Sequence, residues 1–128
     1  MFNNIKYFIQ RGKRGYSNQD LWNVDSYLCE IIPPMVRHLK DTQTGCPSEF
    51  FDASKVNDEC WKWKAVLEEI AQGFEAAQEI GNTHCSYRKN NDNGSFSYEF
   101  DEERAKQLRA KFERGIELLK ETFFGLWD

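Results

Sequence analysis

The sequence predicts a mostly α-helical domain. Apolar residues recur at every third or fourth position in three separate stretches, which is the spacing of one face of an α-helix. The segments between these stretches are rich in Pro, Gly, Asn, Asp and Ser, the residues of turns. The chain has 128 residues, enough to enclose one hydrophobic core. We therefore expect residues 1–128 to form a single-domain bundle of three long helices, with the first helix kinked at a Pro-Pro pair and an N-terminal arm packed across the bundle.

The first long helix is predicted to begin near Asn18. Ser17 is a good N-terminal cap, and Asp20 stands three residues later, close to the pattern of a capping box. Pro33 and Pro34 interrupt the apolar stripe, but its phase continues beyond them, so we expect a kink rather than a second helix that begins at Pro34. The stripe consists of Leu21, Val24, Leu28, Ile31 or Ile32, Met35 and Leu39.

The second long helix is predicted over residues 58–80, after a connection at residues 41–57. Gly73 lies inside this helix at a cost of about 1 kcal/mol relative to Ala, which indicates a close crossing with another helix. The pair Gly81 and Asn82 is a natural C-terminal stop. The inner face is expected to hold Trp63, Leu67, Ile70, Phe74 and Ala77.

The third long helix is predicted to begin after Asp101, whose side chain can cap the first turn. Two glutamates follow it, where negative charge suits the N-terminal end of a helix. The preceding segment, residues 82–99, is either a mobile loop or a small hairpin with its turn at Asn93 and Gly94. The apolar rhythm of the helix is set by Ala105, Leu108, Phe112, Ile116, Leu119 and Phe123.

The N-terminal arm is basic, while the whole chain has a net charge of −4. Residues 1–16 contain no acidic side chain, and residues 1–10 suit either a helix or a short strand. An acidic body argues against general nucleic-acid binding, because that affinity depends on neutralising phosphates. The arm could still hold one phosphate or one acidic partner. Its basic residues are Lys6, Arg11, Lys13 and Arg14.

The four cysteines show no paired spacing of the kind that zinc sites use, even when His38 and His84 are added. We expect them to be reduced and to behave as small hydrophobic residues, and we expect no metal and no cofactor. No apolar run is long enough to cross a membrane, and the N-terminus lacks the apolar core of a secretory signal. These features predict a cytoplasmic protein. The cysteines are Cys29, Cys46, Cys60 and Cys85.

No catalytic motif stands out, which favours a protein that is not an enzyme. Asp25 lies one helical turn from Leu21, near the apolar stripe, and a buried carboxylate needs a partner such as Lys6, Arg11 or Arg14. That pairing would be structural. Alternatively, these residues line a polar pocket in which an aromatic wall and basic groups hold a base and a phosphate. The candidate ligand-binding residues are Lys6, Arg11, Lys13, Arg14, Trp22, Asp25 and Tyr27.

The run from Lys6 to Ser17, followed by Leu21-Trp22-Asn23, resembles a group of small proteins from tailed bacteriophages. In that group a similar basic turn precedes a Leu-Trp-Asn-x-Asp helix. Three later features are also similar, although Cys46 and the residues near 52–57 depart from the pattern. They are Gly45-Cys46-Pro47, the stretch from Trp61 to Glu75, and the end Phe124-Gly125-Leu126-Trp127-Asp128.

The resemblance implies a phage origin and hence the host cytoplasm, but it assigns no catalytic residue. We expect a non-enzymatic accessory protein that acts by binding, for example a counter-defence protein that sequesters a host defence protein or a small nucleotide signal. The alternatives are a structural protein of the virion or of packaging, and a small nucleotide-processing enzyme. The expected partner is a host or phage protein or a small nucleotide, with no membrane, and homo-oligomerisation is left open.

Overall fold

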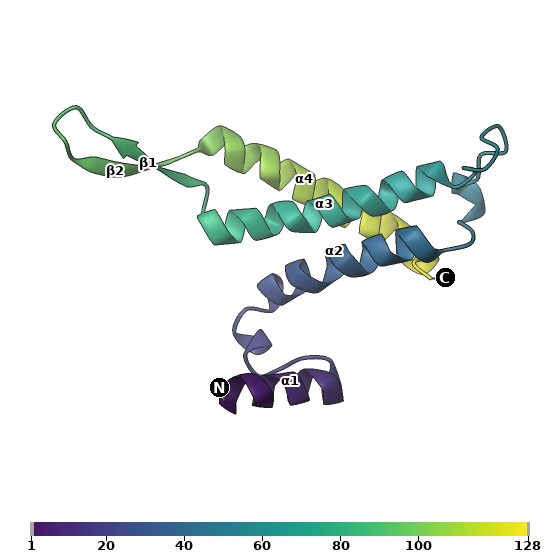
Figure 1. The fold of residues 1–128 in the computed structure, drawn as a ribbon. Coiled ribbons are helices and arrows are strands. Elements are labelled where there is room, and N and C mark those ends of the chain that lie inside the picture. Colours follow the sequence, from purple (N-terminus) through teal and green to yellow (C-terminus); the bar gives the residue numbers. More distant parts are fainter. Residues whose placement is uncertain (1, 128) are drawn as a thin grey trace.

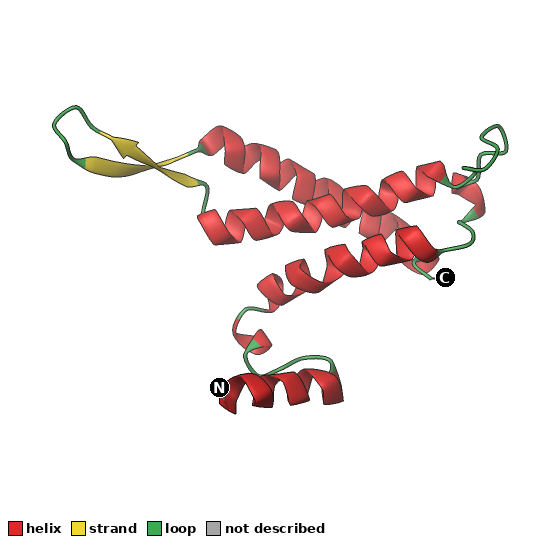
Figure 2. Cartoon of the chain, in the orientation of Figure 1, coloured by secondary structure: helices red, strands yellow, loops and turns green. Residues whose placement is uncertain are grey.

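The computed structural model of the chain describes residues 2–127 and is mostly helical (Figure 1). Within that range a small antiparallel hairpin separates the last two helices (Figure 2). The sequence therefore predicted the mostly helical class correctly, but it left open whether residues 1–10 form a helix or a short strand, and the structure places residues 2–10 in a fourth helix. The elements are α1 (Phe2–Arg14), α2 (Val24–Thr42), α3 (Trp61–Thr83), β1 (Ser86–Asn90), β2 (Phe96–Phe100) and α4 (Glu102–Thr122), with 3₁₀ turns η1 (Asp20–Trp22), η2 (Ser48–Phe50) and η3 (Phe123–Gly125).

The main core lies where α3 packs against α2 on one side and α4 on the other (Figure 1). Trp63, Leu67 and Ile70 on α3 have no exposed surface. They step along one helical face, as the predicted inner face requires. The buried residues of this core are Cys29, Val36, Trp63, Leu67, Ile70, Phe74 and Leu118.

Gly73 and Gly115 form the closest approach between α3 and α4. A Cβ atom on Gly73 would lie 2.9 Å from the Cα atom of Gly115 and 2.9 Å from the carbonyl oxygen of Lys111. A Cβ atom on Gly115 would lie 3.0 Å from the Cα atom of Gly73. The close crossing predicted at Gly73 is confirmed, and two facing glycines make it possible.

The second helix α2 is a single helix that continues through Pro33 and Pro34. It begins at Val24 rather than near Asn18. The capping pair forms as predicted, because the Ser17 N–H donates to Asp20 Oδ2 at 2.7 Å and the Asp20 N–H donates to Ser17 Oγ at 3.2 Å. These bonds close the turn at residues 17–20, which leads into η1, so the pattern marked this turn and not the start of the long helix.

The ends of α3 also differ from the predicted ones. The helix runs past Gly81 and Asn82 and stops at Thr83, because His84 adopts a left-handed conformation with φ 49°. The cap predicted for α4 is confirmed: Asp101 accepts a hydrogen bond from the backbone N–H of Arg104 at 3.0 Å. Residues 82–99 are not one loop, since β1 and β2 pair from Ser86–Phe100 to Asn90–Phe96.

A charged cluster joins α2 to α3. Arg37 Nη2 donates to Glu68 Oε1 at 2.9 Å and also pairs with Glu75, and Lys40 Nζ lies 2.8 Å from Glu68 Oε2. The hydrogen bonds from Arg37 and Lys40 lower the pKa of Glu68 from 4.5 to about 2. Glu68 therefore remains ionised in the folded protein well into the acid range.

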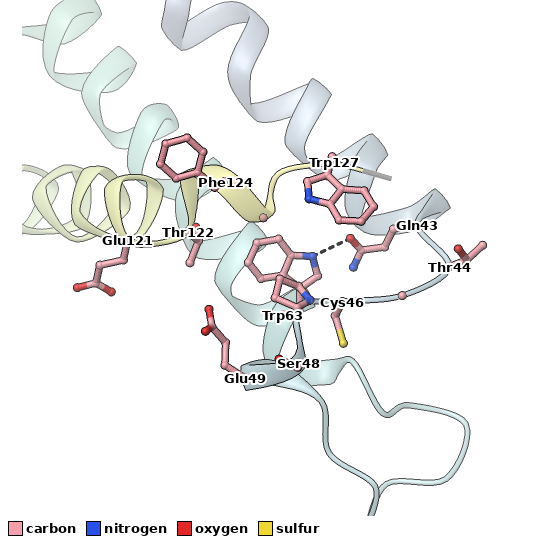
Figure 3. Close-up of a pocket in the computed structure, with 13 residues that line it drawn as sticks. Gln43, Thr44, Cys46, Ser48, Glu49, Trp63, Glu121, Thr122, Phe124 and Trp127 are labelled. Carbon is pink, nitrogen blue, oxygen red and sulfur yellow. Dashed lines mark hydrogen bonds between the residues drawn. The ribbon is translucent and has the colours of Figure 1, made fainter.

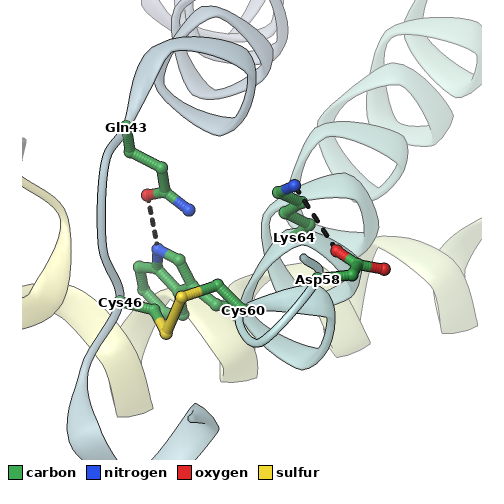
Figure 4. The surroundings of a disulfide bond; sticks show 6 residues. Gln43, Cys46, Asp58, Cys60 and Lys64 are labelled. Carbon is green, nitrogen blue, oxygen red and sulfur yellow. Dashed lines mark hydrogen bonds and ion pairs between the residues drawn. A yellow bond between two sulfur atoms is a disulfide. The ribbon is translucent and has the colours of Figure 1, made fainter. Parts of the chain in front are cut away.

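A disulfide joins Cys46, before η2, to Cys60, at the start of α3 (Figure 4). Their Cα atoms lie 5.8 Å apart across a sequence separation of 14 residues. The expectation that all four cysteines are reduced is therefore wrong for this pair, because the connection folds back over the start of α3. Cys29 and Cys85 are free and buried, as predicted.

The N-terminal arm is not packed across the bundle, which corrects the prediction. It forms helix α1, which lies beyond the N-terminal end of α2 and away from α3 and α4 (Figure 1). No residue of α1 is buried, and the side chains of Phe2 and Phe8 are 83% and 78% exposed. The aromatic residues of the arm thus contribute nothing to the core that the sequence led us to expect.

None of the helices within residues 2–127 combines the length and apolar character that a membrane crossing requires. In the same part of the chain, no three His, Cys, Asp or Glu side chains gather closely enough to hold a metal ion.

Candidate functional site

The arm is held to the chain that follows it by Arg11 and Asp20. Arg11 Nε donates to Asp20 Oδ2 at 2.9 Å, and Arg11 Nη2 donates to Oδ1 at 2.5 Å. Asp20 is only 8% exposed, and the Arg11 guanidinium holds the pKa of its carboxyl well below the usual value. This two-point pair fixes the end of α1 against η1.

Asp25 does not have the role that the sequence suggested. It is exposed, and it forms no ion pair with any residue in the range 2–127. The expectation of a carboxylate paired with the arm was sound, but the residue is Asp20. The sequence missed it because Asp20 was already assigned to a cap, and because α2 begins six residues later than expected, at Val24 instead of Asn18.

Two other predicted ligand residues also bond to the arm. The Tyr27 hydroxyl donates to the carbonyl oxygen of Gly15, and the Arg11 guanidinium lies 5.0 Å from the centre of the Tyr27 ring. Arg14 donates to the carbonyl oxygen of Tyr16 at 3.0 Å and to the side chain of Asn18. Three of the polar groups that were predicted to hold a ligand, those of Arg11, Arg14 and Tyr27, are thus bonded within the chain.

The remaining predicted ligand residues face solvent and do not converge. Lys6 and Lys13 on α1 are exposed, and Trp22 on η1 is also exposed. The structure brings together Arg11 and Tyr27 from the predicted set, but a cavity of about 540 Å³ lies at the other end of α2 and includes none of the set. The proposed base-and-phosphate pocket is therefore not assembled in this conformation.

Helix α1 turns its polar side toward the chain and its apolar side toward solvent. Arg11 and Arg14 bond to the following segment, and Gln10 Oε1 accepts from the Asn18 N–H at 2.8 Å. By helical spacing the apolar residues fall on the opposite side, with Lys6 and Lys13 along one edge. We call this side the α1 apolar face; it consists of Phe2, Ile5, Phe8 and Ile9, all exposed.

More apolar surface lies in the next segment. Leu21 and Trp22 of η1 and Val24 at the start of α2 are each at least half exposed. Because monomeric proteins rarely expose large apolar side chains in such density, this end of the molecule has the composition of a protein-binding surface.

A cavity of about 540 Å³ lies at the opposite end of α2 (Figure 3). The connection after α2, the start of α3 and the segment after α4 form its walls. Trp63 Nε1 donates to Gln43 Oε1 at 2.7 Å, which fixes the indole ring at the base of the cavity. Glu49 and Glu121 line it, and no Lys or Arg does so among the described residues.

Comparisons with protein-family models, with curated proteins and with solved structures find no match to this chain. The resemblance to phage proteins remains a prediction from the residues. Two features of the fold are open to a binding partner or ligand, the α1 apolar face and the cavity.

Proposed function

We propose that the protein acts by binding another protein and that α1 is the element that docks. One observation carries the proposal: the polar side of α1 is hydrogen-bonded to its own chain, and its apolar side is exposed to solvent. In a phage, as the sequence resemblance suggests, this would be an accessory protein that occupies a groove on a host protein, for example a defence protein.

The geometry of α1 suits helix-in-groove recognition. Phe2, Ile5 and Ile9 stand at spacings of three and four residues, the arrangement of anchors that enter a groove. A free helix of 13 residues is marginal in water, and exposed apolar surface costs about 25 cal/mol per Å². Docking would remove both costs, and the Arg11–Asp20 pair already holds the helix in place, which lowers the entropy lost on binding.

The charges of α1 define the chemistry of the partner. The helix contains no acidic residue, and Lys6 and Lys13 flank its apolar face. Two copies of α1 would place like charges against each other, which disfavours self-pairing. We therefore infer an apolar groove with an acidic rim on a different protein.

A small nucleotide is a weaker candidate as the ligand of the arm. Its phosphate would have to displace the buried carboxylate of Asp20 from Arg11, because that guanidinium is already bonded at two points. Lys6 and Lys13 point away from this pair by helical spacing, so residues 2–16 offer no convergent set of cations. No specific contact favours a virion role or nucleotide processing.

The test compares variants as immobilised bait in lysate from the host. Ile5→Asp would place a charge in the docked face, and we expect a retained protein to bind about 100-fold more weakly. Tyr98→Asp is the matched control, because Tyr98 is an exposed aromatic residue on β2, outside the proposed surface. The captured protein is then purified and its affinity for each variant is measured.

Two further binding experiments with the same variants distinguish a protein partner from the other possible partners of α1. Vesicles with anionic lipid test a membrane surface, and light scattering after size exclusion tests a second copy of the chain. If Ile5→Asp abolishes vesicle binding or dimerisation but leaves protein capture unchanged, the proposed partner class is wrong. If no binding event depends on Ile5, the docking role of α1 is wrong altogether.

A further inference from the structure

We propose that the cavity between the α2–η2 connection and the C-terminal segment binds a small organic ammonium cation. The inference uses residues far from α1 and does not depend on the proposed docking. The cavity has a volume of about 540 Å³, which is within the range of small-molecule sites. Three segments that are distant in the sequence meet there, so the cavity belongs to the tertiary fold and not to one loop (Figure 3).

Aromatic surface is available at the cavity in an unusual amount. Phe124 and Trp127 both line it, and their side chains are 92% and 73% exposed. At these exposures neither ring is part of the core, and the Phe124 ring packs edge-on against the neighbouring Phe123 ring, with 5.4 Å between the ring centroids. The face of an aromatic ring attracts a cation, and Trp does so most strongly.

Trp63 contributes support rather than a polar contact. Its only hydrogen-bond donor is already used by Gln43, so the indole offers no group that would select an anion or a carbonyl. The ring is fully buried and forms the base on which the C-terminal segment lies. Gln43 accepts this bond through Oε1, and its own Nε2 is a buried donor without a partner within residues 2–127 at the same cavity.

The charge of the cavity is negative. Glu49 and Glu121 are its ionisable residues among those described, and neither pairs with a Lys or Arg within residues 2–127. Two unpaired carboxylates in a cavity that aromatic side chains also line favour a cation and repel phosphate or carboxylate ligands. No third metal-ligating side chain joins them in the described chain, which favours a diffuse organic cation over a metal ion.

The wall of the cavity is held in place by packing. A Cβ atom on Gly125 would lie 2.9 Å from Pro47 Cγ and 3.5 Å from Trp63 Cη2, so η3 rests directly on these two side chains. The disulfide from Cys46 to Cys60 anchors the same connection to α3. A wall that does not have to be ordered on binding loses less entropy, which favours even a small ligand.

The experiment is a titration of the whole protein with tetramethylammonium chloride at constant ionic strength, followed by NMR at the indole N–H signals of Trp63 and Trp127. Neopentyl alcohol, which has nearly the same shape without the charge, is the comparison ligand. We expect saturable shifts with tetramethylammonium in the millimolar range and about tenfold weaker response to the alcohol.

Variants locate the binding to this cavity. Trp127→Leu should weaken binding about tenfold and Glu121→Gln several-fold, both followed at the Trp63 signal. Glu117→Gln is the control, because Glu117 lies one turn earlier on α4 and does not line the cavity. Equal shifts with the neutral alcohol, no saturation, or equal binding by all three variants would each overturn the proposal.

Discussion

Arg11 and Asp20 form a two-point hydrogen-bonded ion pair that fixes α1 to the turn after it. The carboxylate and the guanidinium, which a polar ligand site would need, are therefore already bonded to each other. It also sets which side of α1 faces outward, because the residues that share the Arg11 side of the helix are turned toward the chain. The exposed apolar face is a direct consequence of this bond.

The first prediction removes that bond. Asp20→Asn should loosen α1, since the amide cannot accept from both guanidinium nitrogens and Arg11 would keep only the more distant carboxylate of Glu30, at 3.8 Å, as a charged partner within residues 2–127. Hydrogen exchange of the α1 amides should become faster, while exchange in α3 stays unchanged. Asp25→Asn is the control and should alter neither region, because Asp25 is exposed and unpaired within residues 2–127. Equal exchange in both variants would show that the pair does not hold α1.

A second prediction concerns acid stability. The folded pKa of Glu68 is about 2, below its ordinary value of 4.5, so its pairing stabilises the fold above pH 4.5 and is lost as the pH falls toward 2. Because both partners are about one-third exposed, we expect a contribution of about 1 kcal/mol after allowance for solvent screening. Urea unfolding should show Glu68→Gln less stable than wild type at pH 6, with the difference shrinking by pH 2.5. A constant difference would contradict this.

Third, the glycine pair at the α3–α4 crossing should be intolerant of a methyl group. Gly115→Ala should destabilise the protein by about 2 kcal/mol, because the new Cβ would overlap Gly73. Gly81→Ala is the matched control, since nothing lies within 4 Å of its Cβ position. That change should stabilise α3 by about 0.5–1 kcal/mol. Thermal unfolding distinguishes the two, and a similar effect at both positions would rule out the close crossing.

The fourth prediction tests the disulfide. Closing a loop of about 15 residues contributes about 3 kcal/mol by restricting the unfolded chain. Cys46→Ser should therefore lower the free energy of unfolding by about that amount, and reducing agent should destabilise wild type but not the variant. If wild type is insensitive to reductant, the bond does not form in solution. Such a bond is uncommon in a reducing cytoplasm, so the same measurement bears on the expected compartment.

Much of the helical core was predictable because its signal is local. The 3.6-residue rhythm identified the inner face of α3, the cost of a mid-helix glycine pointed to the crossing at Gly73, and Asp101 gave the start of α4. In each case the residue acts within one helix or on one neighbour. The role of Gly115 in the close helix crossing was not predicted, because it depends on the position of Gly115 opposite Gly73 in the folded chain.

The direction of α1 could not be predicted from the pattern of its residues. An apolar face indicates a surface that is covered, but it does not indicate whether the chain's own core or a partner covers it. The orientation of α1 depends on its hydrogen bonds to Asp20, which lies outside the helix. The Cys46–Cys60 bond could not be predicted either, because a separation of 14 residues does not indicate that two cysteines lie close together in the folded chain. The cavity is formed by three segments that are distant in the sequence, and no single segment contains a residue pattern that predicts it.

The most direct test of the docking role of α1 is site-specific photocrosslinking in cells that express the protein. A benzophenone side chain replaces Phe8, on the apolar face, or Asn4, which helical spacing places on the polar side of the same helix. The account predicts a defined adduct with one acidic protein from position 8 and little or none from position 4. Equal adducts from both positions, or none from position 8, would contradict it.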